Sequence, residues 1–360
     1  MLEPPTADCR PPAVPFAIAG RAIGPGEPPY IVAEISANHR QDFQQAVAIV
    51  RAAAEAGADA VKLQTYTADT LTLDCDRPPF RIRGTIWNGR TLHDLYREAA
   101  MPWDWQPKLR EVAHGLGLTL FSTPFDATAV AFLESLSVPA YKIASFEIVD
   151  LSLLRCVAAT GKPVILSTGM ATLEEIDEAL RTLRQAQAGP VALLKCTSAY
   201  PAGPDEMNLY GIPRLAEVFG VPVGLSDHTL SATVPVAAVA LGATIVEKHL
   251  TLSRAQGGPD CAFSLEPAEF QQMAAAVRTA HQALGSAQFG AGPGEVASCR
   301  LRRSLFAVRD IRAGERFTTE NVRSIRPADG LPPRYLDRVL GATARVAIPR
   351  GTPLAWEHLA

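Results

Sequence analysis

Eight short apolar runs alternate with helix-like segments along most of the chain. Each run is bounded by turn residues and is followed by an amphipathic stretch, such as FQQAVAIVRAAAEAGA after the first. The runs are almost continuously apolar, which is typical of parallel strands covered by helices. Eight strand–helix units predict an α/β fold, a (β/α)8 TIM barrel, with an open doubly wound sheet as the alternative. The runs are 30–35, 60–66, 118–124, 140–147, 163–169, 191–200, 222–228 and 244–250.

The segments around these units differ in composition. Residues 1–28 are rich in proline and predict a mobile leader before a barrel domain at 29–285. Residues 286–298 are rich in glycine and small side chains and predict a linker. Residues 299–360 alternate apolar and polar side chains over short spans, which predicts a small β-rich domain. The connection from 67 to 117 carries three of the four tryptophans, and its length is typical of a lid or an interface.

Charge and cysteine usage exclude several classes of protein. A net charge of -3 provides no basic field for nucleic acid. The six cysteines form no CxxC pair, so we expect reduced thiols and a cytoplasmic protein. No run approaches the roughly 18 apolar residues that span a bilayer, and the amino terminus lacks the order of a signal peptide. We therefore expect neither a nucleic-acid nor a membrane partner.

Two of the apolar runs end in a histidine. PVGLSDH ends at His228, and TIVEKHL reaches His249 just before its last residue. In a parallel barrel both would lie at the carboxyl edge, where active sites form. Strand alternation places Ser226 on the face of His228, and Glu247 on that of His249. Two imidazoles leave coordination positions open, which favours a catalytic metal over a structural one.

Three lysines lie within strands, at Lys62, Lys142 and Lys195. A buried lysine is costly unless it is paired, so we expect each to meet a carboxylate or a ligand phosphate. Glu34 and Glu147 at strand ends could transfer protons, bind substrate hydroxyls or pair with these lysines. Hydroxyl side chains at neighbouring strand ends could bind the same anion or could cap the following helices; they are Ser145, Ser167, Thr168, Thr197 and Ser198. The residues alone therefore predict a metal-using barrel enzyme that accepts a small anionic substrate.

Eight motifs, in order, resemble the sialic acid synthase family. They are IVAEISANH, ADAVKLQTY, FSTPFD, YKIASFEI, ILSTGMAT, CTSAYP, GLSDHT and EKHLTL. The resemblance extends from about residue 30 to the carboxyl terminus, where RRSLFAVRDIRAGERFTTENVRSIRP is similar to an antifreeze-like (SAF) domain. GTIWNGRTLHDLYREA, TSAYPAGPDEMNL and SRAQGGPDCAFSLEP resemble the pseudaminate branch, and Ser198 stands where the N-acetylneuraminate branch typically has asparagine.

The resemblance implies a reaction and a set of site residues. The family condenses phosphoenolpyruvate with a 2-acetamido sugar aldehyde and releases phosphate, using a divalent metal, usually Mn2+, with Mg2+ or Co2+ as alternatives. It implies that His228 and His249 hold the metal. Phosphoenolpyruvate would bind Lys62, Thr123, Lys142, Ser145, Ser167 and Ser198. The sugar would contact Glu34, Gln64, Glu147, Tyr200 and Asp260, with Ser226 on the same polar face as His228.

The resemblance also implies a partner. In this family the SAF domain of one chain caps the barrel of another in a domain-swapped homodimer, and Arg326 matches the arginine that reaches the partner's sugar site. Three alternatives remain open from the sequence. They are the same chemistry on an N-acetylneuraminate or legionaminate precursor, an aldolase with a Schiff-base lysine, and a carbohydrate- or ice-binding module.

Overall fold

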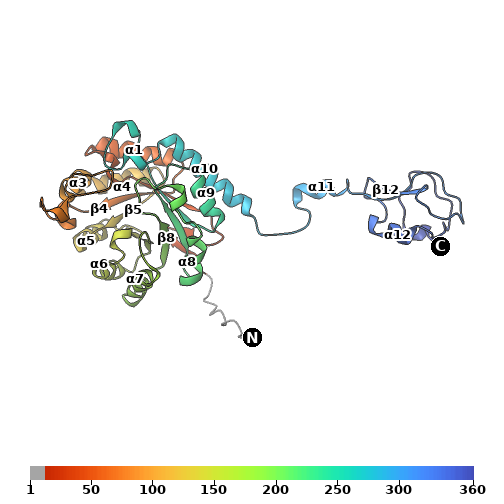
Figure 1. The fold of residues 1–360 in the computed structure, drawn as a ribbon, viewed down its shortest axis with the longest axis horizontal. Helices are drawn as coiled ribbons and strands as arrows, with labels where there is room; N and C mark the ends of the chain where they lie inside the picture. Colours follow the sequence, from red (N-terminus) through yellow and green to blue (C-terminus); the bar gives the residue numbers. More distant parts are fainter. Residues whose placement is uncertain (1–12) are drawn as a thin grey trace. The chain divides into compact units, whose positions relative to one another are not determined.

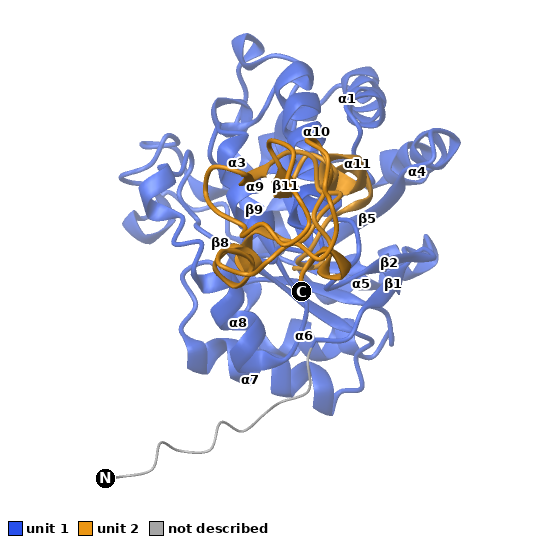
Figure 2. Cartoon of the chain, turned by 90° about the vertical axis from the view of Figure 1, so that its right-hand side faces the viewer, with its two compact units in different colours: residues 1–285 blue, residues 286–360 orange. Residues whose placement is uncertain are grey.

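The computed structural model of the chain describes residues 13–360 and divides into two compact units, Met1–Gly285 and Ser286–Ala360 (Figures 1 and 2). Within the described residues of the first unit, eight parallel strands close into a barrel, and the open-sheet alternative is wrong. Neighbouring strands follow the order of the chain, and the last strand pairs with the first. The barrel strands are β3 (Tyr30–Glu34), β4 (Ala60–Thr65), β5 (Thr119–Pro124), β6 (Tyr141–Ile143), β7 (Val164–Ser167), β8 (Val191–Cys196), β9 (Val223–Asp227) and β10 (Ile245–His249).

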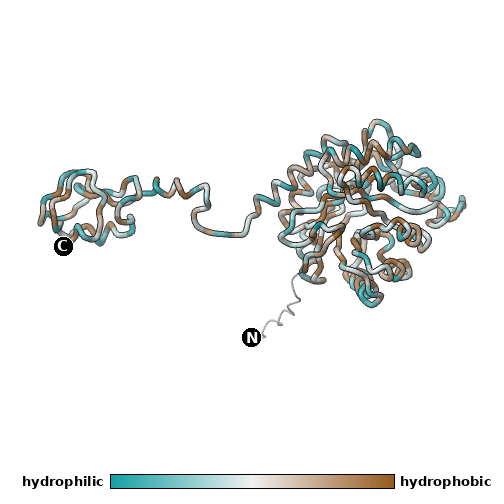
Figure 3. Tube along the Cα trace, turned by 180° about the vertical axis from the view of Figure 1, so that it is seen from behind, coloured by the Kyte–Doolittle hydropathy of each residue, from teal (hydrophilic) through white to brown (hydrophobic). Residues whose placement is uncertain are grey.

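Helices follow the strands and surround the barrel (Figure 1). Several begin at a side-chain cap: Asp42, Asp126, Asp150 and Thr172 each accept hydrogen bonds from the first turn of the helix that follows. Most of these helices carry both hydrophilic and hydrophobic residues, and both colours occur along the tube in Figure 3. The helices are α1 (Phe43–Glu55), α4 (Gln106–Gly115), α5 (Ala127–Ser135), α6 (Leu151–Ala158), α7 (Leu173–Gln185), α8 (Gly211–Phe219), α9 (Thr233–Ala240) and α10 (Pro267–Leu284), with α2 (Ala68–Leu71) and α3 (Leu92–Ala99) inside the long insertion. No helix in the described range is long and apolar enough to cross a membrane.

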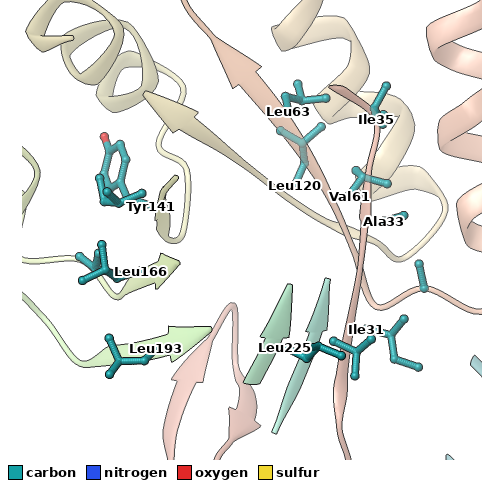
Figure 4. Packing of buried hydrophobic residues seen from close by; sticks show 14 of the residues in the cluster. Ile31, Ala33, Ile35, Val61, Leu63, Leu120, Tyr141, Leu166, Leu193 and Leu225 are labelled. Carbon is teal, nitrogen blue, oxygen red and sulfur yellow. The ribbon is translucent and has the colours of Figure 1, made fainter. Parts of the chain in front are cut away.

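The barrel has two apolar layers because side chains alternate along each strand. Side chains on the outer faces, such as Ile31, Val61 and Leu193, pack against the helices and form the larger core (Figure 4). Side chains on the inner faces, such as Val32 and Phe121, form a smaller core inside the barrel. The polar residues of the inner faces therefore collect toward the carboxyl edge of the strands.

A hairpin lies in the segment that the sequence predicted as a leader. Strands β1 (Phe16–Ile18) and β2 (Arg21–Ile23) pair antiparallel, and Ile18 and Ile23 are fully buried. They belong to the inner core with Tyr30 at the amino end of its strand, so the hairpin closes the amino-terminal end of the barrel. The segment predicted as a leader therefore contains an ordered hairpin at 16–23, and residues 1–12 lie outside the described range. Two apolar residues in so short a hairpin give no periodicity to detect.

The second unit has its own core of Leu305, Phe317, Val339 and their neighbours. One antiparallel pair, β11 (Ser304–Ala307) with β12 (Val322–Ile325), and several isolated bridges hold it together. Its short helices are α11 (Val296–Cys299) and α12 (Leu336–Val339), and the first of these begins inside the segment predicted as a linker. This small bridged unit agrees with the expected β-rich domain.

Candidate active site

The two histidines meet at the carboxyl edge, as the strand register requires. Strands β9 and β10 pair with Lys248 opposite Asp227, which brings His228 and His249 to adjacent positions one residue further along. Their ring centroids lie 5.3 Å apart, and both side chains are buried. The pairing predicted from the sequence is therefore present in the structure.

Both imidazoles are suited to bind a metal ion. His228 Nδ1 lies 2.8 Å from the Thr197 carbonyl oxygen, which can only accept, so this nitrogen carries the proton and Nε2 keeps a free lone pair. Burial lowers the pKa of His228 to about 4, and burial and then the neighbouring His228 lower that of His249 well below its usual value. His249 Nδ1 is buried and has no hydrogen-bond partner among the described residues. The described residues contain no group of three or more His, Cys, Asp or Glu side chains placed for a metal, so other ligands would have to complete the shell.

One layer deeper, two lysines and two glutamates form a buried charged cluster. Lys62 Nζ lies 2.6 Å from Glu34 Oε2 and 3.5 Å from Glu247 Oε1. Lys142 Nζ lies 3.3 Å from the same Glu247 oxygen, which also accepts a hydrogen bond from Ser226 at 3.2 Å. The pairing of Lys62 and Lys142 with carboxylates agrees with expectation. Glu247 was noted in the sequence only as a neighbour of His249, and strand alternation alone does not reveal that it joins both lysines.

The charges in this cluster hold one another in place. Burial acts to lower the pKa of Lys62, but Glu247 and Glu34 outweigh it and the pKa ends above its usual value. Burial acts to raise the pKa of Glu247, and Lys142 and Lys62 outweigh that effect and lower it. The pKa of Lys142 falls because burial dominates there. The two lysines are therefore already ordered inside the barrel and can bind an anion that enters it.

Small side chains and a glycine surround the next strand ends. The Gly169 backbone N–H donates to Ser145 Oγ at 3.0 Å, and Ser167 Oγ is buried without a partner in the described chain. A Cβ on Gly169 would lie 2.7 Å from Ser145 Oγ and closer still to Ser198 Oγ. Two serine hydroxyls, those of Ser145 and Ser198, thus crowd the backbone at Gly169 and leave no room for a side chain there. Thr123, on the other side, accepts a hydrogen bond from Lys62 at 3.3 Å.

A chain of hydrogen bonds links the first two strands to the loop after β10. Gln64 Nε2 donates to Glu34 Oε1 at 3.2 Å and to Ser36 Oγ at 2.9 Å. Ser36 in turn donates to Asp260, which also accepts from the backbone N–H of Ala37 at 3.3 Å. The structure therefore connects Glu34, Gln64 and Asp260, three of the residues implied for sugar binding. Ser36 was missed because a lone serine after a strand carries no distinctive pattern.

Glu147 lies in the loop after β6, and one carboxylate oxygen is buried without a partner in the described residues. Burial raises the pKa of Glu147 to about 7. A carboxyl group with this pKa is half-protonated near neutral pH and can give or take a proton.

Three aromatic side chains adjoin the histidines, and we call Trp87, Tyr200 and Phe263 the aromatic cluster. The Tyr200 ring lies 4.5 Å from that of His228, and the Phe263 ring 4.9 Å from that of His249. Trp87, from the long insertion, lies 5.7 Å from Tyr200 and 6.4 Å from Phe263. The sequence did not place the tryptophans of the insertion in relation to the site.

Three side chains that the sequence offered for binding an anion make other contacts at the edge of this site. Lys195 was expected to meet a carboxylate or a ligand phosphate, yet it donates to the Cys196 carbonyl oxygen at 2.9 Å and packs against Gly211 at the start of α8. It occupies an outer position of β8, whose inner positions are Ala192 and Leu194. Thr168 and Thr197 donate to the backbone carbonyls of Leu194 and Glu206, so neither hydroxyl is available to the anion. Arg326 belongs to the second unit, just after β12.

Comparison with known proteins settles the family. The model of the NeuB family matches residues 49–289, and that of the SAF domain matches residues 302–360. The chain belongs to the NeuB family. NeuB-family synthases are metal-dependent enzymes that condense phosphoenolpyruvate with sugars, so this chain is an enzyme of that class, and the reading as a binding module is wrong.

Three relatives can be aligned with this NeuB-family chain over almost its whole length. Pseudaminic acid synthase of Helicobacter pylori is 43% identical over 92% of this chain and 98% of its own. Pseudaminic acid synthase of Campylobacter jejuni is 43% identical over 90% and 95%. N,N'-diacetyllegionaminic acid synthase of Legionella pneumophila is 35% identical over 92% and 94%.

Solved structures agree with this assignment. The N-acetylneuraminic acid synthetase of Leptospira borgpetersenii has a TM-score of 0.71 at 29% identity, covering 79% of this chain and 95% of that one. The spore coat polysaccharide biosynthesis protein SpsE of Bacillus subtilis has a TM-score of 0.66 at 32% identity, covering 96% and 99%. The barrel and its added domain are therefore shared with solved relatives.

Proposed function

We propose that this NeuB-family chain is a pseudaminic acid synthase. It condenses phosphoenolpyruvate with 2,4-diacetamido-2,4,6-trideoxy-L-altrose, forms pseudaminic acid and releases phosphate. The observation that carries the sugar assignment is the 43% identity to pseudaminic acid synthases over nearly the whole chain, against 35% to a legionaminic acid synthase. The charged cluster and the paired histidines support the chemistry.

Phosphoenolpyruvate binds between the charged cluster and the serine-lined turn. Lys62 and Lys142 are buried cations that attract its carboxylate and phosphate. Further donors come from Thr123, Ser145, Ser167, Ser198 and the Gly169 turn. Ser226 acts indirectly, because its hydroxyl holds Glu247. The unpartnered Ser167 hydroxyl gains an acceptor when the phosphate arrives.

His228 and His249 would hold a divalent metal, for which we propose manganese, with magnesium and cobalt as alternatives. Such an ion supplies Lewis-acid polarisation of the sugar's aldehyde oxygen. Tyr200 and the Glu34–Gln64–Asp260 chain orient the sugar beside the histidines. An aldehyde held in this way faces the phosphoenolpyruvate bound one layer deeper.

The reaction consumes one water, whose two protons end on the new hydroxyl and on the released phosphate. Carbon 3 of the enolpyruvate forms a bond to the aldehyde carbon, and the aldehyde oxygen takes a proton to become a hydroxyl. Glu147 or Glu34 supplies that proton, since burial raises the pKa of both carboxyls. Water then adds to carbon 2, and one of its protons restores the glutamate. The tetrahedral intermediate expels phosphate, which carries away the other proton, to leave the 2-keto acid.

Two further features belong to the same proposal. The chain works as a domain-swapped homodimer in which Arg326 of one SAF domain reaches the sugar site of the other chain. The reaction takes place in the cytoplasm. Size measurement in solution tests the dimer, and Arg326→Ala would raise the KM for the sugar more than that for phosphoenolpyruvate.

Phosphate release tests the function directly. We expect release from phosphoenolpyruvate and manganese with the L-altro sugar, and none after EDTA treatment or in His249→Ala. The D-manno isomer of the legionaminate branch and N-acetylmannosamine serve as competing sugars. Turnover of either alone would keep the chemistry and overturn the sugar assignment, and an absence of release with all three would overturn the proposal.

A further inference from the structure

The loop that carries Trp87 is ordered by its own hydrogen bonds. Ile82 and Gly89 close it, since the Ile82 N–H donates to the Arg90 carbonyl at 2.9 Å and the Gly89 N–H donates to that of Ile82 at 3.0 Å. The backbone N–H of Trp87 itself donates to Thr85 Oγ1 at 3.2 Å. Arg90 then anchors the loop to α3 through Glu98 at 2.7 Å. Trp87 is thus held at the tip of a loop whose shape does not depend on a ligand.

This tip contacts the site at two points. Trp87 Nε1 donates to the Pro259 carbonyl oxygen at 2.8 Å, immediately before Asp260. Its ring adjoins Tyr200 and Phe263, which in turn adjoin His228 and His249. Trp87 therefore lies one ring further from the histidines than the rest of the aromatic cluster.

The side of the aromatic cluster formed by Trp87 and Phe263 offers few hydrogen-bonding groups. An indole has one hydrogen-bond donor and no acceptor, and in Trp87 that donor is already used by Pro259. Phe263 has no polar side-chain atom, so Tyr200, whose ring lies nearer His228, carries the hydroxyl of the cluster. A hydroxyl pressed against the Trp87 and Phe263 rings would lose its water without gaining a partner from them, whereas a methyl group would gain from burial. The surface therefore favours an apolar substrate end.

We propose that Trp87 is a specificity-determining residue, which forms the wall against the C6 methyl end of the sugar and disfavours a 6-hydroxyl group. The inference rests on the proposed function, in which the aldehyde end lies at His228 and His249. The opposite end of an extended sugar then reaches the aromatic ring furthest from them, which is that of Trp87. In this way the insertion between β4 and β5 selects the substituent on C6, a carbon atom remote from the reacting aldehyde.

A matched pair of sugars isolates this contact. The substrates are the 2,4-diacetamido-2,4,6-trideoxy-L-altrose and its analogue with a hydroxyl on C6, each at saturating phosphoenolpyruvate. We expect the wild type to prefer the 6-deoxy sugar in kcat/KM by about 10²-fold, as apolar pockets do against an added hydroxyl. Trp87→Ala should bring that ratio to within a few-fold of one, mainly by loss on the 6-deoxy sugar. Trp87→Phe, which keeps an aromatic wall, should retain most of the preference.

Controls separate recognition from folding. Ile86→Ala changes the neighbouring residue, half exposed at 50%, and should keep the wild-type ratio. The KM for phosphoenolpyruvate should stay constant in Trp87→Ala, because Trp87 touches neither lysine. Equal losses on both sugars, or an unchanged ratio, would overturn the inference while leaving the proposed function intact. Failure of the wild type to turn over either sugar would instead overturn the proposed function, and the inference with it.

Discussion

Lys62 Nζ lies 2.6 Å from Glu34 Oε2, and the exposed fractions of the two side chains are 4% and 0%. At such burial, an ion pair stabilises the protein mainly by preventing either charge from being left alone. In the function we propose, phosphoenolpyruvate would share Lys62 with this glutamate, so its binding would redistribute the charges of an existing pair.

Loss of one partner of this pair should be worse for stability than loss of both. We expect Lys62→Met to lower the free energy of unfolding by about 3–5 kcal/mol, since Glu34 keeps a buried charge without its main partner. The double variant Lys62→Met/Glu34→Gln should recover much of that loss and remain inactive in phosphate release. Urea unfolding of the wild type, both single variants and the double variant measures the coupling. Additive effects of the two changes would contradict this account.

Glu147 should impose a pH dependence near neutrality. Its pKa, which burial raises to about 7, should appear in the kcat/KM profile of the wild type and disappear in Glu147→Gln. Folding disfavours the ionised form, because the pKa of Glu147 in the folded protein lies above the usual glutamate value of 4.5. The wild type should therefore lose stability relative to Glu147→Gln as pH rises from about 4.5 through 7. Thermal unfolding of both proteins at pH 5 and pH 8 checks this, and a difference that does not change with pH would refute it.

Gly169→Ala should damage phosphoenolpyruvate binding selectively. The added methyl group would press against Ser145 and Ser198, the hydroxyls that we assign to phosphate. We expect the KM for phosphoenolpyruvate to rise by about 10- to 100-fold, a loss of one or two hydrogen bonds, with a much smaller change for the sugar. Gly115→Ala is the matched control, because a methyl group there meets nothing within 4 Å. Equal changes in both KM values would point to general distortion.

A lysine inside the barrel and a lysine on its outer face should differ in how their substitution affects activity. Lys142→Met should abolish phosphate release, since Lys142 faces Glu247 inside the barrel. Lys195→Met should retain activity within a few-fold, because Lys195 faces helix α8 and bonds to a backbone carbonyl. Borohydride with pyruvate should trap no adduct on the wild type. A trapped adduct, with activity that survives a chelator, would favour the Schiff-base aldolase instead.

Sequence periodicity predicted the barrel because its eight strands are buried on both faces and stay apolar. The same alternation placed His228 and His249 together, since residues at matching strand ends must meet. Periodicity could not assign Lys195 correctly. A lysine in a strand can pack its aliphatic stem against a helix as readily as it can bind an anion with its ammonium group, and the sequence pattern is the same in both cases. It also could not place Trp87, whose position against the site depends on a contact with Pro259, far away in the sequence. The two lysine partners of Glu247 could be identified only from the arrangement of the three strands that carry these residues.

The hairpin of β1 and β2 affects how the enzyme can be shortened. The family match begins at residue 49, and the sequence alone suggests that the fold starts near residue 29. A polypeptide cut at that point would lose Ile18 and Ile23 and leave Tyr30 and Ile245 facing water at the base of the barrel. Such a truncation would aggregate or fail to express although every residue of the chemistry is present. A shortened protein must therefore begin before residue 16, so that the hairpin of β1 and β2 still closes the base of the barrel.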